Sequence, residues 1–406
     1  MGIHVVGGVY KEYCVHPRWN EIYGSAGRAA LAIATMGTPT VLHSYMDKQA
    51  LEILATKGIY CDSFELRATE VTGTVRFRYL HDLAIPLISG IPTTPFSCLE
   101  VHEDKVVRFG MLDGDARVDA EWAVYDPQNV REGRPFRENG SKAKHLALVL
   151  NSWEAAQMAG RPGAPAAEVA PLLAAQQQAE VIIVKMGPLG AYVWTASSVV
   201  QVPAYRTSRV WKIGSGDCFV AHFANAWMEQ GRTPADAAEI ASKATAYYCN
   251  TQSFVTPEIL AGLQFPAVQA SAAYRNGEQR QVYLAGPFFD LSQVWMVDQV
   301  RANLSEVGLK VFSPYHDVGL GAANDVVEKD LDAIKSSHLL FALADGLDAG
   351  TIYEIGYARA LGKPVVVYSE RDYGSGSLKM MEGSGCVMCS DYTTAIYTAL
   401  WEAVKI

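Results

Sequence analysis

The stretch FPAVQASAAYRNGEQRQ, residues 265–281, divides this 406-residue chain into two parts. It is small and polar and lacks the periodicity of a helix or a strand, so it predicts a linker over residues 265–280. On each side of it, strand-like apolar runs alternate with helix-like segments, which is the pattern of an α/β fold. Because the chain is longer than one core usually supports, we expect two α/β domains, at residues 1–264 and 281–406.

Beyond the linker, the alternation restarts with a strand and continues through about five strands. The expected strands cover residues 282–285, 310–313, 338–343 and 364–368, and the helices between them cover 293–306, 326–336 and 351–361. This order predicts a flavodoxin-like, doubly wound parallel sheet, whose ligand binds at the carboxyl ends of the strands.

Before the linker, the pattern predicts a larger α/β domain with a small additional sheet. Residues 71–80 and 99–109 are rich in β-branched and aromatic residues, and we expect them to form an antiparallel lid. The remaining expected strands cover residues 3–8, 40–44, 146–150 and 181–185, and the helices cover 24–36, 152–159, 165–177, 219–230 and 234–248.

The composition favours small-molecule ligands. The formal net charge is -9, so we expect neither a nucleic acid nor a membrane as partner. No run approaches the roughly 20 apolar residues that a membrane-spanning helix needs. No basic leader precedes the apolar run at residues 3–6. Seven scattered cysteines suit a reducing compartment, and we expect a cytoplasmic protein.

A set of carboxylates in the second half suits the cleavage of a glycosidic bond. Asp348 and Glu354 lie six residues apart across a predicted strand-to-helix turn, and Asp330 supplies a third acid. One carboxylate can attack or stabilise the oxocarbenium-like C1′, while another acid protonates or orients the departing base. The alternative is structural: Asp348 caps the helix and Glu354 favours its positive end.

Residues 281–406 resemble the nucleoside 2-deoxyribosyltransferase family. The matching segments are residues 283–289, 330–334, 348–354, 355–358 and 362–365. The resemblance implies that Glu354 is a nucleophile that forms a covalent deoxyribosyl ester. It further implies that Asp330 and Asp348 bind or protonate the base and that Tyr283 positions the nucleophile. The aromatic loop that follows Tyr283 is then expected to bind substrate through Gly286, Phe288 and Phe289.

Two departures from this family leave its chemistry open. Ser336-Ser337-His338 stands where an acidic residue is common, and Ser377–Met381 offers no counterpart of a C-terminal asparagine. Nucleoside and 5′-monophosphate both remain open as substrate. Water and a second base both remain open as the group that resolves the intermediate.

The first half contains a glycine-rich turn, Gly214-Ser215-Gly216-Asp217, before an apolar helix. Such a turn lets exposed N–H groups and the helix dipole attract phosphate oxygens. Asp217 can take a proton from an alcohol that attacks a phosphoryl group. The same four residues also make a sensible helix start without any chemistry.

Residues 1–260 resemble the PfkB (ribokinase-like) sugar and nucleoside kinase family. The turn resembles its G-A-G-D signature, Asp126–Asn129 its D-P-N segment, Asn151–Glu154 its N-x-x-E motif, and Lys185–Ala191 its G-x-x-G-A turn. The resemblance implies a ribokinase-like α/β domain with a small β lid, ATP as ligand, Asp217 as base and magnesium near Glu154. The residues implied for ATP and phosphate are Gly214, Ser215, Gly216, Asn151, Glu154, Lys185, Gly187 and Gly190.

The acceptor side departs from that family. Trp211 stands where the family has an acid, Glu12 replaces the aspartate that holds sugar hydroxyls, and Arg28 replaces an asparagine. Glu12 and Arg28 are therefore candidate substrate-binding residues. Three interpretations of Arg28 stay open: a clamp for an anionic acceptor, a sign that kinase chemistry is lost, or an outward salt bridge.

Together these patterns predict an enzyme of nucleoside or nucleotide metabolism. The C-terminal domain needs no cofactor, and the N-terminal domain binds ATP and magnesium if it is active. That domain either phosphorylates a sugar or nucleoside or, as the alternative, is a degenerate kinase that senses a nucleotide and regulates the glycosidase. Both resemblances imply a homo-oligomer, a dimer or larger.

Overall fold

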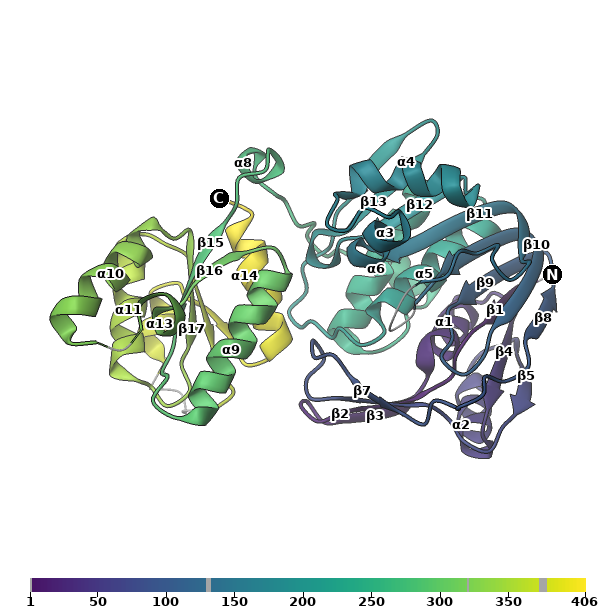
Figure 1. Cartoon of the computed structure of the whole chain (residues 1–406), viewed down its shortest axis with the longest axis horizontal. Coiled ribbons are helices and arrows are strands. Elements are labelled where there is room, and N and C mark those ends of the chain that lie inside the picture. Colours follow the sequence, from purple (N-terminus) through teal and green to yellow (C-terminus); the bar gives the residue numbers. More distant parts are fainter. Residues whose placement is uncertain (1, 129–132, 320, 372–377) are drawn as a thin grey trace. The chain divides into compact units, whose positions relative to one another are not determined.

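The computed structural model describes residues 2–128, 133–319, 321–371 and 378–406. The chain divides into two compact units (Figure 1). The first unit comprises residues up to Thr207 together with Trp211–Ala267, and the second comprises Ser208–Val210 together with Val268–Ile406. Asn129 and Ser377, which belong to motifs quoted above, lie outside the described residues.

The first unit is built on one large sheet in the order β14-β13-β12-β11-β10-β9-β1-β4-β5, with β8 paired to β10. All pairs from β12 to β5 are parallel, and β13 and β14 extend one edge antiparallel. The strands are β1 (Ile3–Val6), β4 (Thr40–Met46), β5 (Phe64–Glu70), β8 (Leu99–His102), β9 (Lys105–Phe109), β10 (Ala116–Asp126), β11 (Lys142–Asn151), β12 (Val181–Lys185), β13 (Ala191–Thr195) and β14 (Val199–Val202).

Helices cover both faces of this sheet, which is why its strands read as continuous apolar runs. Alternate strand residues point to opposite faces, so β12 gives Ile183 to one core and Ile182 to the other. The first core contains α1 (Gly24–Thr35), α2 (Lys48–Gly58), α5 (Ser215–Ala224) and α6 (Pro234–Thr251). The second core contains α3 (Ser152–Met158) and α4 (Ala166–Gln177). The short helix α7 (Pro257–Gly262) follows α6.

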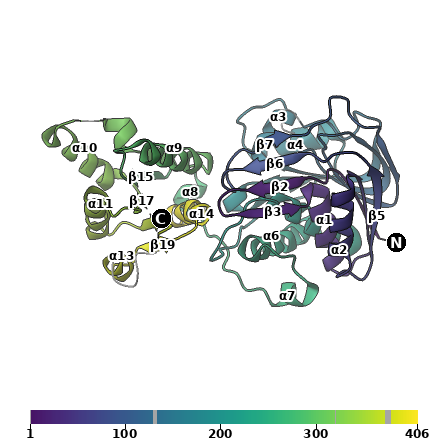
Figure 2. The same ribbon diagram turned by 90° about the horizontal axis from the view of Figure 1, so that it is seen from below.

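A separate four-stranded sheet stands where the lid was expected, in the order β3-β2-β6-β7 (Figure 2). It is mixed and not antiparallel throughout, because β2 and β6 pair in parallel. Its strands are β2 (Lys11–Cys14), β3 (Trp19–Ile22), β6 (Arg76–Tyr79) and β7 (Leu87–Ser89). The placement of residues 99–109 in this lid was wrong, because β8 and β9 belong to the main sheet. β9 is parallel to both β1 and β10, and its residues from Val106 to Phe109 are buried. Composition marked these residues as strands but could not assign them to a sheet.

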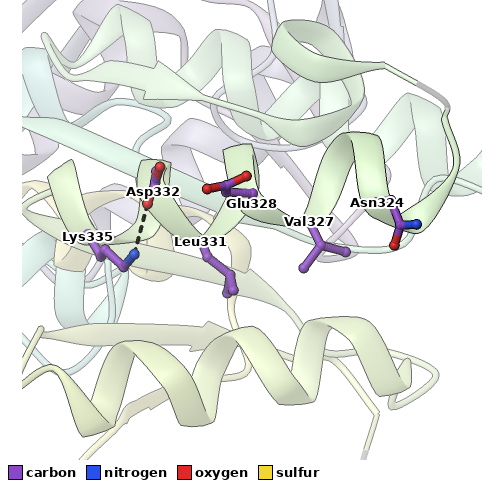
Figure 3. Close-up of a pocket in the computed structure, with 6 residues that line it drawn as sticks. All are labelled: Asn324, Val327, Glu328, Leu331, Asp332 and Lys335. Atoms are coloured by element: carbon purple, nitrogen blue, oxygen red, sulfur yellow. Dashed lines mark hydrogen bonds and ion pairs between the residues drawn. The ribbon is translucent and has the colours of Figure 1, made fainter.

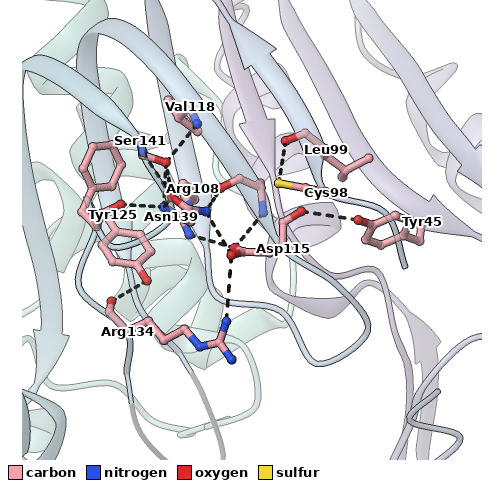
Figure 4. A network of polar contacts seen from close by, with 12 residues as sticks. Tyr45, Cys98, Leu99, Arg108, Asp115, Val118, Tyr125, Arg134, Asn139 and Ser141 are labelled. Atoms are coloured by element: carbon pink, nitrogen blue, oxygen red, sulfur yellow. Dashed lines mark hydrogen bonds and ion pairs between the residues drawn. The ribbon is translucent and has the colours of Figure 1, made fainter. Parts of the chain in front are cut away.

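A partly buried polar network joins the loops that follow β9 and β10 (Figure 4). Arg108 on β9 pairs with Asp115 at 2.9 Å and donates to Ser141 Oγ at 3.0 Å. Asn139 donates to the other oxygen of Asp115 at 3.0 Å. A buried guanidinium is tolerated only when it is paired and hydrogen-bonded, so this network fixes the two loops as a structural element.

The second unit is a five-stranded parallel sheet in the order β16-β15-β17-β18-β19. This is the flavodoxin-like order 2-1-3-4-5, as expected. Its strands are β15 (Gln281–Ala285), β16 (Lys310–Phe312), β17 (Leu339–Leu343), β18 (Val365–Tyr368) and β19 (Val387–Cys389). One face carries α9 (Leu291–Glu306) and α14 (Tyr392–Ala403), and the other carries α10 (Ala323–Ser336), α11 (Ala349–Ala360) and α13 (Lys379–Gly383) (Figure 1).

Part of the expected linker is folded into the second unit. Residues 272–275 form α8 (Ala272–Arg275), and Ser271 N donates to Val404 O at 2.7 Å. The buried Arg280 donates to Ser271 Oγ at 3.1 Å and to the carbonyl oxygen of Ile406. These bonds attach the segment to the C-terminal end of the chain. Across the described residues, no helix combines the length and apolarity needed to cross a membrane.

Candidate active site

Tyr283 and Glu354 meet beside the carboxyl edge of the second unit's sheet. Tyr283 lies on β15 and is fully buried, and Glu354 lies near the start of α11. Tyr283 Oη donates to Glu354 Oε1 at 2.5 Å. The ring of Phe312 from β16 stacks on Tyr283 at a centroid distance of 5.7 Å. The tyrosine is therefore rigid, and it fixes the orientation of the Glu354 carboxyl group.

The electrostatics of Glu354 suit a group that changes charge near neutral pH. The pKa of Glu354 is raised to about 7, chiefly by burial; the Tyr283 hydrogen bond lowers it, and the nearby carboxylates of Asp330 and Asp348 add to the rise. Burial together with Glu354 raises the pKa of Tyr283. Tyr283 therefore stays protonated and donates its hydrogen bond, as a positioning residue must.

Asp348 serves as the N-cap of α11, as the structural alternative predicted. Its Oδ2 accepts hydrogen bonds from Thr351 N at 2.8 Å and from Thr351 Oγ1 at 3.0 Å. Leu347, just before it, has a φ of 52°, in the left-handed region that bulky residues rarely adopt. Such strain is concentrated at functional loops, and no residue pattern predicted it here.

Asp330 on α10 presents an unsatisfied buried acid to this site. Its Oδ1 is buried and has no hydrogen-bond partner among the described residues. Burial raises the pKa of Asp330. Buried polar atoms in proteins almost always have a partner, so this oxygen marks a place where a ligand donor would bind.

Aromatic rings lie after the neighbouring strands β15 and β16. Phe288 packs 5.6 Å from Phe289 and 5.6 Å from Tyr315, and Phe289 is 74% exposed. A Cβ at Gly286 would approach the Leu343 side chain to 3.1 Å, so a small residue is required there. Tyr315 was not anticipated, although an aromatic directly after a strand of a parallel sheet was the available signal.

A surface hollow of about 320 Å³ lies along another face of α10 (Figure 3). Its lining residues recur at helical spacing and include Val327, Leu331 and the ion pair of Asp332 with Lys335 at 2.8 Å. Asp330 points from a different face of the helix and does not line it. The hollow is therefore separate from the acidic site.

In the first unit, the glycine-rich turn forms the start of α5. Gly214 has a φ of 79°, and α5 begins at Ser215. Lys185 on β12 approaches the turn, since a Cβ at Gly216 would lie 3.4 Å from its Nζ. Lys212 Nζ donates to Ser215 Oγ at 3.3 Å. Two ammonium groups beside a helix N-terminus suit an anion. Lys212 was not anticipated, although a cation two residues before the turn was visible.

Lys185 is itself paired with a buried acid. Its Nζ lies 2.6 Å from Asp126 at the end of β10, and burial raises the pKa of Asp126 to about 7.

The turn that follows β12 needs its two glycines: φ is 55° at Gly187 and 97° at Gly190, where a Cβ would lie 2.1 Å from Val202 O. The backbone conformation thus explains both glycines of this motif. That the motif binds a nucleotide stays a prediction.

Asn151 and Glu154 form a reciprocal cap on α3. Asn151 Oδ1 accepts from Glu154 N at 2.8 Å, and Glu154 Oε2 accepts from Asn151 N at 2.8 Å. In the described part of the chain, no group of three or more His, Cys, Asp or Glu could hold a metal ion. A magnesium ion is commonly held by one carboxylate plus substrate phosphates. Glu154, with Oε1 outside the cap, fits that arrangement.

Arg28 is fully buried, and this corrects two interpretations. Its Nη1 lies 2.7 Å from Asp217 Oδ2, its Nη2 donates to Glu12 Oε2, and its Nε donates to Tyr248 Oη at 3.1 Å. Burial opposes its charge, but Glu12, Tyr248 and Asp217 outweigh this and raise the pKa of Arg28. The outward salt bridge was wrong. Glu12 and Arg28 bind each other here, so neither is open to an acceptor. Trp211, which stands where the kinase family has an acidic residue, is buried and packs against Trp19.

Two family models match this chain in consecutive segments. Residues 142–258 match the pfkB family carbohydrate kinase model, and residues 282–388 match the nucleoside 2-deoxyribosyltransferase model. The chain thus contains matches to both families in that order: the first lies in the ribokinase-like α/β unit, and the second lies in the flavodoxin-like unit. Both recognitions made from the motifs are confirmed. A comparison with curated proteins finds no match.

Solved structures similar to this chain include three kinases. Ribokinase from Giardia lamblia is 13% identical, with a TM-score of 0.49, and covers 64% of this chain and 97% of its own. The nucleoside kinase from Methanocaldococcus jannaschii is 13% identical, with a TM-score of 0.47 and the same coverage. Ribokinase from Arabidopsis thaliana, in complex with ribose and ATP, is 14% identical, again with a TM-score of 0.47 and this coverage.

Proposed function

We propose that the second unit cleaves or transfers the N-glycosidic bond of (2′-deoxy)nucleosides or their 5′-monophosphates, with Glu354 as nucleophile. The observation that carries the proposal is the 2.5 Å hydrogen bond from Tyr283 to Glu354 Oε1. It holds one carboxylate oxygen and leaves Oε2 to attack C1′ of the sugar. The match to the deoxyribosyltransferase model supports the same reaction class.

Each acidic residue then has a distinct role. The bond from Glu354 to C1′ forms while the bond from C1′ to the base nitrogen breaks, and the electron pair leaves on the base. Asp330, whose pKa is raised by burial, is the group that protonates or hydrogen-bonds the departing base. Asp348 caps α11 and adds negative charge beside Glu354. Water or a second base then attacks the ester and restores the carboxylate.

The test is mass spectrometry of the products from a panel of nucleosides and 5′-monophosphates. The Glu354→Ala variant should lose several orders of magnitude in rate, because truncation removes the nucleophile itself. Glu306→Ala is the matched control, since this exposed acid ends α9 at the opposite edge of the sheet. Turnover retained in Glu354→Ala would overturn the assignment. Adding an acceptor base to the reactions separates transfer from hydrolysis.

For the first unit, we propose that ATP or another phosphorylated nucleoside binds at the turn Gly214–Gly216. The support is the pair of ammonium groups beside the start of α5. A nucleotide bound there has one of two roles. Either it donates a phosphoryl group to a sugar or nucleoside, or the unit senses it and regulates the glycosidase. The buried ion pair of Asp217 with Arg28 favours the second. If Mg-ATP changes neither the rate nor the products of base release, the regulatory coupling is wrong.

A further inference from the structure

Asp217, the base of any phosphoryl transfer in the first unit, is held on both carboxylate oxygens. Arg28 Nη1 donates to Oδ2 at 2.7 Å, and Gln128 Nε2 donates to Oδ1 at 2.7 Å. Gln128 is itself held, because Ser25 Oγ donates to its Oε1 at 2.5 Å. A general base must accept a hydrogen bond from the acceptor hydroxyl at about 2.6–3.2 Å. Proton uptake by Asp217 would instead break a buried ion pair.

The space beside the turn is filled by the same arginine. A Cβ built on Gly214 would lie 2.1 Å from Arg28 Nε and 2.3 Å from its Cζ, so the guanidinium packs directly on the turn's first glycine. An acceptor hydroxyl has to lie between Asp217 and a phosphate held by the turn. In this chain that position belongs to the side chain of Arg28.

Arg28 is anchored from four elements. Glu12 on β2 binds its Nη2, Tyr248 on α6 accepts from its Nε, Asp217 on α5 binds its Nη1, and α1 carries it. Tyr248 is fixed in turn, because its hydroxyl donates to Ile213 O at 2.9 Å. The side chain of Arg28 is only 1% exposed. These contacts make it part of the core and not a swinging ligand clamp.

The phosphate side of the turn is flanked by two ammonium groups. Gly216 and Ser215 are approached there by Lys185 and Lys212, and Gly216 is only partly buried. The two sides of the turn therefore differ: an anion can approach the N–H groups, while the acceptor side is filled and ion-paired.

We propose that the Glu12–Arg28–Asp217 cluster is a built-in lock on the first unit, which leaves it able to bind a nucleoside triphosphate but unable to transfer the γ-phosphoryl group to an alcohol. This rests on the proposed nucleotide binding at the turn. In the blocked step, the acceptor oxygen would bond to the γ-phosphorus, and the bond to the bridging oxygen would break with its electron pair leaving on the diphosphate. Asp217 would take the hydroxyl proton.

The test combines binding and turnover on the full-length chain. Thermal melting with and without Mg-ATP measures binding, and release of ADP in the presence of a panel of sugars and nucleosides measures transfer. We expect the wild type to melt higher with Mg-ATP and to release no ADP above the rate without protein. If neither ATP nor another nucleoside triphosphate shifts the melting temperature, the proposed nucleotide binding is wrong, and the lock proposal that rests on it falls as well. Wild-type ADP release that Asp217→Asn abolishes would refute the lock.

The double variant Glu12→Gln/Arg28→Gln tests the lock directly. It removes the cation together with its principal carboxylate partner and leaves Asp217 free of an ion pair. We expect acceptor-dependent ADP release at least tenfold above the triple variant that adds Asp217→Asn. A folded, ATP-binding double variant with no such release would overturn the proposal. If the double variant fails to fold, Glu12→Gln/Arg28→Met, whose uncharged side chain fills the space of the arginine, takes its place under the same criterion.

Discussion

The carboxyl group of Glu354 ionises close to neutral pH, and this gives the reaction a pH dependence. Burial raises its pKa to about 7, and only the ionised form is a nucleophile. We therefore expect kcat/KM for base release to rise with pH through about 7 and to fall about tenfold per unit well below it. A pH–rate profile from pH 5 to 8 measures this. A flat profile across that range would contradict the role given to Glu354.

Arg28 illustrates how strongly burial changes the contribution of an ion pair to the free energy of unfolding. Arg28→Ala leaves Glu12 and Asp217 buried without a cation, and breaking a buried pair in this way costs about 3–5 kcal/mol. Arg67→Ala is a matched control, because Arg67 also faces two carboxylates, Glu65 and Glu103, but is 48% exposed. Exposed pairs of that kind contribute little to stability, because water and salt screen them. Urea unfolding of both variants compares the two, and equal losses would show that burial does not set the difference.

At the scale of elements, helix α3 allows two roles of Asn151 to be distinguished: capping of the helix and binding of ATP. Asn151→Ala removes the cap on Glu154 N and should lower the free energy of unfolding by about 1 kcal/mol. Gln157→Ala, an exposed position in the same helix, should change it little. Thermal melting with and without Mg-ATP completes the comparison. A variant that loses stability but keeps its ATP-induced shift would limit Asn151 to capping.

Most elements could be predicted from the sequence, because buried parallel strands and amphipathic helices each leave a local pattern. The strands β15 and β17 and the helix α11 were predicted to within about two residues. The lid strands β2 and β3 were missed, since four-residue strands with polar faces have no such pattern. In the same way, the motifs predicted Glu354 and Tyr283 together. The pairing of Arg28 with Asp217 joins positions 189 residues apart, which no local spacing encodes.

At the scale of the whole molecule, the two units have separate hydrophobic cores, and we expect them to unfold separately. Calorimetry should resolve two transitions, because each unit buries its own sheet. Mg-ATP should raise the transition of the first unit, and a nucleoside that is cleaved slowly should raise that of the second. A single transition that moves as one with either ligand would show that the two units are thermodynamically inseparable.

The cluster of Glu12, Arg28 and Asp217 also limits how this chain can evolve. Replacing Arg28 alone leaves two carboxylates buried without a cation, so that single step passes through a less stable protein. Proteins sit only slightly above the stability they need, so such intermediates are purged. We therefore expect Arg28 to change only together with its carboxylate partners. A kinase-competent variant of this unit is therefore expected to need several coordinated substitutions, and no single one.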